Sequence, residues 1–202
     1  MPNLPNNTQI PAARVPIWDK VTDYVTREWY RWFYNTYIAI EAGRRYGSFY
    51  STTTFTPAVI NTAYAITFNN TYLRVDGSEL VYGVYVDSTI TSRIYVDNTA
   101  TYNFQFSAQL QESGGGIKQV YIWPRINGVN VDDSATNVTL ANGSNARAVA
   151  AWNFVLNLRS GDYFELIYSA NSTNISIPYV AASSPVPAIP SVILTVTSSV
   201  GG

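Results

Sequence analysis

The chain changes its hydrophobic period once, near residue 46. Before that point, apolar and aromatic side chains recur at helical spacing and form one stripe: Trp29, Trp32, Phe33, Thr36 and Ile40. Thr26 can cap the start of such a helix, Glu28 suits its positive end, and Gly43 can close it. The pattern therefore predicts one helix, over residues 26–43.

Beyond residue 46 the period is two. Runs rich in Val, Ile, Thr, Tyr and Phe, separated by turn residues, predict strands at 48–56, 58–68, 82–86, 92–96, 101–111, 118–126, 149–158, 163–169 and 192–197. Alternation is clearest where Tyr102, Phe104 and Phe106 share one face. Short strands with regular turns predict an antiparallel β-sandwich, most simply a jelly roll.

One predicted strand, 118–126, is apolar on both faces. Val120 and Ile122 lie on one side, and Tyr121 and Trp123 lie on the other. We therefore expect this strand to be covered on both faces. The Gly114–Gly116 run lacks the Lys and Ser/Thr of a phosphate-binding loop, so it predicts a turn, as does Asn127-Gly128.

The start of the chain has a different composition. Residues 1–17 contain four prolines, which predict an extended arm because proline fixes φ and removes a backbone donor. We expect two parts: an arm and helix over residues 1–45, and a β-domain over residues 46–202. The fold class is mainly β, an antiparallel jelly-roll β-sandwich preceded by the arm and one aromatic helix.

Composition excludes several kinds of function. The chain has no cysteine and no histidine, so zinc sites built on these residues, cysteine nucleophiles and Ser-His-Asp triads are absent. A formal net charge of −1 supplies no basic field for nucleic acid. No apolar run reaches the roughly 18 residues that indicate a membrane span. We expect no cofactor and no enzymatic activity.

The carboxylates have ordinary explanations. Adjacent residues on a strand point to opposite faces, so Asp132 and Asp133 suit acid–base chemistry poorly unless they lie in a loop, and a solvated loop is expected. Glu112 is the other tempting acid. Four further aspartates follow the pattern of turn residues and lack calcium-loop spacing, so no metal site is expected: Asp76, Asp87, Asp97 and Asp162. A glycan hydrolase built on paired carboxylates is the least favoured alternative.

The predicted helix is unusually aromatic. Its candidate docking residues are Arg27, Trp29, Tyr30, Arg31, Trp32, Phe33, Tyr34 and Tyr37. A helix with aromatic residues on several sides needs cover. Two arrangements supply it: packing against the chain's own domain, or insertion into another protein or against symmetry mates, where aromatic clusters act as hot spots.

Three segments of the β-domain occur in the order found in the complement and tumour-necrosis-factor jelly-roll superfamily. Residues 94–104 (IYVDNTATYNF) resemble its strand–turn–strand segment, with Ala100 where glycine is usual. Residues 125–128 (RING) look like its Asn-Gly turn, and 158–166 (LRSGDYFEL) resemble its Gly-Asp strand entry. The resemblance implies a homotrimer packed through aromatic side chains around a three-fold axis. Candidates for these contacts are Tyr102, Phe104, Phe106, Tyr163 and Phe164.

The N-terminal segment carries a second resemblance. Residues 14–16 (RVP) followed by 25–33 (VTREWYRWF) are similar to N-termini of tailed-bacteriophage virion proteins. This resemblance implies a virion protein, assembled in the host cytoplasm, that docks on a portal, adaptor, tail or capsid protein. The expected function is a trimeric short tail or head fibre for host attachment. The alternative is a capsid decoration protein that stabilises the head.

Tyrosine is abundant, with 16 residues in the chain. Exposed Tyr and Asn offer flat stacking area and hydrogen bonds, which suit a host-surface glycan or protein. The other explanation is that the tyrosines line contacts between the subunits of the trimer.

Overall fold

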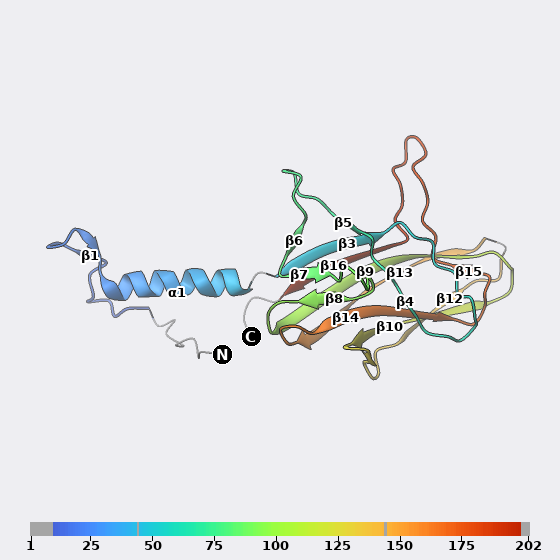
Figure 1. Cartoon of the computed structure of the whole chain (residues 1–202), viewed down its shortest axis with the longest axis horizontal. Coiled ribbons are helices and arrows are strands. Elements are labelled where there is room, and N and C mark those ends of the chain that lie inside the picture. Colours follow the sequence, from blue (N-terminus) through green and yellow to red (C-terminus); the bar gives the residue numbers. More distant parts are fainter. Residues whose placement is uncertain (1–9, 44, 144, 199–202) are drawn as a thin grey trace. The chain divides into compact units, whose positions relative to one another are not determined.

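The computed structural model describes residues 10–43, 45–143 and 145–198. Contacts divide the chain into two compact units, Met1–Arg44 and Arg45–Val200, a division one residue before the predicted one. The first unit holds the helix α1, and the second is built from two antiparallel sheets (Figure 1). Within the described residues, no helix is long and apolar enough to cross a membrane.

The N-terminal unit begins with a small hairpin that the sequence did not predict. Strands β1 (Trp18–Asp19) and β2 (Tyr24–Val25) pair antiparallel. The Asp19 carboxylate closes the turn by accepting from the Val21 amide at 2.8 Å, and the Trp18 indole donates to Asp23 at 2.8 Å. Two-residue strands leave no periodicity to detect. The first nine residues of the predicted arm lie outside the described residues.

Helix α1 (Arg27–Gly43) follows the hairpin directly, one residue after the predicted start. The Thr26 carbonyl accepts the first helical hydrogen bond, from the Tyr30 amide at 2.9 Å. The Thr26 hydroxyl donates to the Pro16 carbonyl at 2.7 Å, and the Trp29 indole donates to the Val15 carbonyl at 3.0 Å. The segment before the hairpin is thereby fixed to the first turn of the helix.

Two sheets form the second unit. Sheet I runs in the order β13 (Arg147–Leu158), β9 (Ala100–Glu112), β16 (Val192–Ser198), β3 (Tyr46–Ser51) and β5 (Asn70–Thr71), with β15 (Ile175–Ser176) beside β9 and β6 (Val81–Tyr82) beside β3. Sheet II runs in the order β11 (Val129–Asn130), β10 (Lys118–Ile126), β14 (Tyr163–Ala170), β8 (Ile94–Val96) and β7 (Val84–Val86), with β12 (Thr136–Leu140) beside β10 and β4 (Tyr64–Ala65) beside β14.

The order of pairing identifies the topology. Strand β3 pairs with β16, the last described strand; β8 pairs with β14, β9 with β13, and β10 with β12, so the pairs are nested within one another. Nested antiparallel pairs distributed over two stacked sheets make a jelly roll. The predicted fold class is therefore confirmed.

The core lies between the two sheets. Alternate residues of the long strands point inward, as in β9, where Tyr102, Phe104 and Phe106 are all at most 2% exposed. Phe104 stacks on Phe164 of the opposite sheet with ring centroids 4.1 Å apart. Leu194 and Val196 of β16 complete this layer, and both are fully buried.

The predicted strand at 58–68 is wrong over most of its length. Only Tyr64–Ala65 pair as a strand, and Val59 and Ile60 are exposed despite being apolar. Asn61 has a φ of 54°, and its amide donates to the Ala170 carbonyl at 2.8 Å, so the backbone turns there instead of extending. Strand β12 was not predicted, because its Thr-Asn-Val-Thr-Leu sequence buries little more than Leu140.

Candidate functional site

The N-terminal helix exposes most of its aromatic side chains. Tyr30, Tyr34 and Tyr37 are 62%, 55% and 60% exposed, and Phe33 is also exposed. Tyr30 and Tyr34 lie one turn apart with parallel rings, 6.4 Å between centroids. Tyr30, Tyr34 and Tyr37 form a tyrosine face, which the described residues of the N-terminal unit leave largely exposed.

The two tryptophans of the helix are held more firmly. Trp29 contacts Trp32 and Phe33 with centroid distances of 5.8 Å each, and both tryptophans are half-buried. Arg27 and Arg31 are exposed. The predicted stripe is therefore a connected cluster of rings from Trp29 to Phe33. The side chain of Ile40, its last member, is not among the side chains that the structure describes.

The candidate trimer contacts require a correction. Tyr102, Phe104, Phe106 and Phe164 are at most 2% exposed within a single chain. Their rings fill the core of their own sandwich, so they offer no surface to a second subunit. Tyr163 is half-buried on the outer side of sheet II, beside Tyr95 at 5.3 Å. The sequence pattern correctly placed Tyr102, Phe104 and Phe106 on one face of their strand, but that face points into the core.

The outward face of sheet I has almost no charge. It consists of the residues that alternate with the core positions: Thr101, Asn103, Gln105, Ser107, Gln109 and Gln111 of β9; Arg147, Val149, Ala151, Asn153, Val155 and Asn157 of β13; Ile193, Thr195 and Thr197 of β16; and Tyr46, Ser48 and Tyr50 of β3. Arg147, at one corner, is the sole charged residue among them. Depletion of charge is the compositional mark of protein interfaces.

Strand β13 also lies at an edge of sheet I. It pairs with β9 on one side, and within the described residues no strand pairs with its other side. Its twelve residues contain no proline and no lysine, the usual protection of an exposed edge. Val149 and Val155 are 58% and 64% exposed along it. A long edge strand with exposed valines and without these protective residues is suited to contact with another protein chain.

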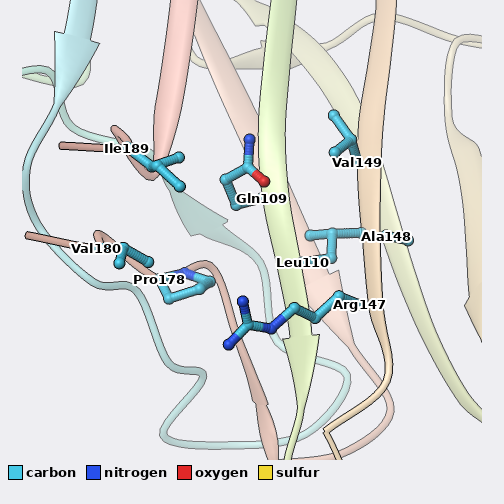
Figure 2. A pocket seen from close by; sticks show the side chains of 8 residues that line it. All are labelled: Gln109, Leu110, Arg147, Ala148, Val149, Pro178, Val180 and Ile189. Atoms are coloured by element: carbon cyan, nitrogen blue, oxygen red, sulfur yellow. The ribbon is translucent and has the colours of Figure 1, made fainter. Parts of the chain in front are cut away.

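A hairpin projects from the sandwich between β15 and β16 (Figure 1). We call residues 180–189 the finger; bridges Val180–Ile189 and Ser183–Val186 hold it together. It is exposed throughout and contains no charged residue. At its base, a pocket of about 280 Å³ lies against the outward side of β9 and β13. Figure 2 shows Pro178, Val180 and Ile189 on the finger side, with the Arg147 side chain extending toward them.

The outward face of sheet II is different, because it combines aromatic and charged residues in an open groove. We call this the β10 groove; its volume is about 780 Å³, and it is lined by Tyr121, Trp123, Asn130, Val131, Asp132, Asp133, Ser134, Ala135 and Ser169. Tyr121 and Trp123 form part of its lining instead of being covered. The expectation that β10 is covered on both faces is therefore wrong for this side.

A short, well-held segment forms the wall of the β10 groove. Asn130 accepts from the Trp123 indole at 2.9 Å and from Arg125 Nε at 3.2 Å. The Val131 amide donates to the Pro124 carbonyl at 3.1 Å, and Ser134 Oγ donates to the Val131 carbonyl at 2.6 Å. The wall is thus fixed to the strand that carries the aromatic residues.

The carboxylates confirm the predicted turn roles. Asp132 and Asp133 are exposed in a turn, and Asp133 has a φ of 55°. Asp76, Asp87 and Asp162 accept bonds from nearby turn groups, chiefly the Ser78 hydroxyl, the Ile90 amide and the Asn127 side chain, which lower their pKa values. Asp97 pairs with Arg45 Nε at 2.6 Å. Among the described residues, no three carboxylates gather as a metal site.

Glu112 is fully buried at the end of β9. Its Oε1 accepts from the Gly115 amide at 3.1 Å, while Oε2 has no partner among the described residues. Gly115 and Gly116 both have positive φ, which confirms the predicted glycine turn. Glu112 therefore holds this turn, and it lines neither of two pockets on the sandwich: the one at the base of the finger and the β10 groove.

Comparisons with known proteins leave the site to be interpreted on its geometry. No family model matches the chain, and no curated protein sequence matches it.

Proposed function

We propose that this chain is a structural protein of a bacteriophage virion: a homotrimeric short tail or head fibre that docks by its N-terminal unit and displays its jelly roll for host binding. Its action is binding without catalysis. The main observation behind the proposal is that the candidate docking surface and the β-sandwich belong to different units of the chain. An exposed tyrosine face lies on a compact N-terminal unit, while the sandwich has a complete core of its own.

The docking step rests on the exposed rings of helix α1. Tyr30, Tyr34 and Tyr37 present large amphipathic surfaces, which are enriched at the centres of protein interfaces. The resemblance of residues 14–16 and 25–33 to phage virion N-termini supports a portal, adaptor, tail or capsid protein as the receiver.

Self-association rests on sheet I. Its outward face is nearly free of charge, its β13 edge is unprotected, and the uncharged finger projects from the same sandwich. Closed cyclic symmetry is the usual result when one chain presents complementary surfaces of this kind. The resemblance to the complement and tumour-necrosis-factor superfamily favours three-fold symmetry.

The proposal is tested by locating the protein on intact phage particles. Antibody–gold labelling of the sandwich should mark the tail or projecting fibres in negative-stain micrographs. An even coat over the head would favour capsid decoration, the alternative function, and absence of label from all accessible surfaces would contradict external display.

A matched pair of variants tests docking. Replacing Tyr30, Tyr34 and Tyr37 together by Ser should abolish incorporation into particles, because it removes exposed rings without touching a core. The control is Tyr24→Ser, a change at a comparably exposed tyrosine in the hairpin of the same unit. Equal incorporation of both variants would contradict docking through the tyrosine face.

A further inference from the structure

The β10 groove contains two aromatic side chains that the packing of the core does not require. Tyr121 and Trp123 are two residues apart on one strand, so their side chains stand on the same face of sheet II, roughly 7 Å apart along the strand. Tyr121 is 36% exposed, and Trp123 is half-buried with its indole N–H bonded to Asn130. Aromatic surface is thus available in an open groove.

The rim of the groove supplies hydrogen-bond acceptors. The carboxylates of Asp132 and Asp133 have no hydrogen-bond or ion-pair partner among the described residues, and both residues are exposed. An ionised carboxylate only accepts hydrogen bonds, so it pairs with a ligand rich in hydroxyl donors. Asn130 uses its oxygen for Trp123 and Arg125, which leaves its amide N–H groups as donors.

The groove is also pre-arranged. The wall segment is tied to β10 by the Val131–Pro124 backbone bond and by the two bonds to Asn130. Ser134 fixes the turn from within by its bond to the Val131 carbonyl. A wall held in this way loses little conformational freedom when a ligand binds.

We propose that the β10 groove binds a neutral carbohydrate, with sugar rings packed on Tyr121 and Trp123 and sugar hydroxyls donating to Asp132 and Asp133. Sugar rings present flat C–H surfaces and many O–H donors, which match these two sets of groups. The carboxylates of Asp132 and Asp133 outnumber the one cation bonded to the groove wall, Arg125, and repel an acidic sugar, so the preferred ligand is uncharged. The volume of about 780 Å³ lies within the usual range for small-ligand sites.

This inference rests on the proposed display function and names its ligand class. The full-length chain is applied to an immobilised array of neutral oligosaccharides built from hexoses, 6-deoxyhexoses and N-acetylhexosamines, with uronic- and sialic-acid oligosaccharides alongside. The affinity for the strongest neutral binder is then measured in solution by isothermal titration calorimetry. We expect neutral sugars to bind and acidic ones to bind at least tenfold more weakly.

Variants then locate the site. Tyr121→Ala and Trp123→Ala should each weaken binding at least tenfold, and Asp133→Asn several-fold. Tyr85→Ala is the control, since Tyr85 is exposed on the outer side of the same sheet and does not line the groove; it should change the affinity less than twofold. Tyr121→Ala and Asp133→Asn alter exposed side chains, so the test does not depend on the half-buried Trp123.

Three results would overturn the inference: no neutral sugar bound on the array, a preference for acidic sugars, or binding that Tyr121→Ala and Asp133→Asn leave unchanged. Its failure is distinguishable from failure of the display function. Fibre labelling without sugar binding removes the groove ligand alone, whereas sugar binding by a chain absent from particle surfaces removes the display function alone.

Discussion

A single charge on the outward face of sheet I should break the proposed trimer. Gln105 lies on β9, with Asn153 of β13 on one side and Thr195 of β16 on the other. Its side chain is exposed in the single chain, so Gln105→Lys should change the free energy of unfolding of one sandwich by no more than about 0.5 kcal/mol. Any larger effect must therefore arise between chains.

The size of that effect follows from the surroundings. The outward-facing residues of β3, β9, β13 and β16 include no carboxylate to pair with a lysine; their one charged residue is Arg147, and the Arg74 guanidinium over the Tyr46 ring adds a second positive charge. An unpaired charge buried in an interface costs about 3–5 kcal/mol. At about 1.4 kcal/mol per tenfold change, dissociation should become roughly a hundred-fold to several-thousand-fold easier.

Sedimentation velocity over a range of concentrations measures this change. The unsubstituted chain should sediment as a trimer, and Gln105→Lys should shift toward monomer at low micromolar concentration. The control is Thr139→Lys, which places the same charge at an exposed position of β12 on sheet II and should leave the trimer intact. If the Gln105→Lys chain stays as trimeric as the control, sheet I is not the interface. A monomeric unsubstituted chain would refute the trimer.

Three further predictions address the two units. Phe164→Ala should lower the free energy of unfolding by about 3–5 kcal/mol in chemical denaturation, because a fully buried ring stacked on Phe104 is lost. The pKa of Asp162 lies below its ordinary value of 3.8, so its contribution is present above that pH and is lost as pH falls below it; Asp162→Asn should flatten this acid loss in urea titrations at pH 2–6. Trp29→Ala should reduce helical circular dichroism while leaving the melting temperature of the sandwich unchanged, since the partners of Trp29 among the described residues, Val15, Trp32 and Phe33, belong to the N-terminal unit.

Each of these three predictions would be contradicted by one specific result. A Phe164→Ala chain of unchanged stability would contradict its place in the core. Equal acid sensitivity of Asp162→Asn and the unsubstituted chain would show that the bonds from Asn127 and Arg159 do not stabilise the fold. A lowered melting temperature of the sandwich with Trp29→Ala would show that the two units are energetically coupled.

Periodicity predicted the long elements well and the short ones poorly. The predicted strand at 118–126 matches β10 to the residue, because its side chains alternate against a continuous core. The hairpin of β1 and β2 was missed, since its stability comes from bonds such as Asp19 to Val21 and not from burial. Apolar composition misled at 58–68, where a turn at Asn61 leaves Val59 exposed.

The candidate site was harder to predict for a different reason. Alternation placed Phe104 on one face of its strand, but it cannot distinguish the chain's own core from a contact with another chain. The same limit applies to Tyr121 and Trp123, which pattern alone treats as covered. Their groove exists because residues 130–135 fold back beside β10, through bonds such as that from Val131 to Pro124.

The nested pairing also determines when the sandwich can form. Strand β16 is the last described strand, yet it lies in the middle of sheet I, between β9 and β3, and pairs Thr197 with Tyr46. A ribosome must therefore synthesise nearly the whole β-domain before this sheet can close. Contacts so distant in sequence fold slowly, on a timescale of roughly milliseconds to seconds. During that interval the edges of β9 and β3 are both open, so the nascent chain is most prone to aggregation just before β16 is made.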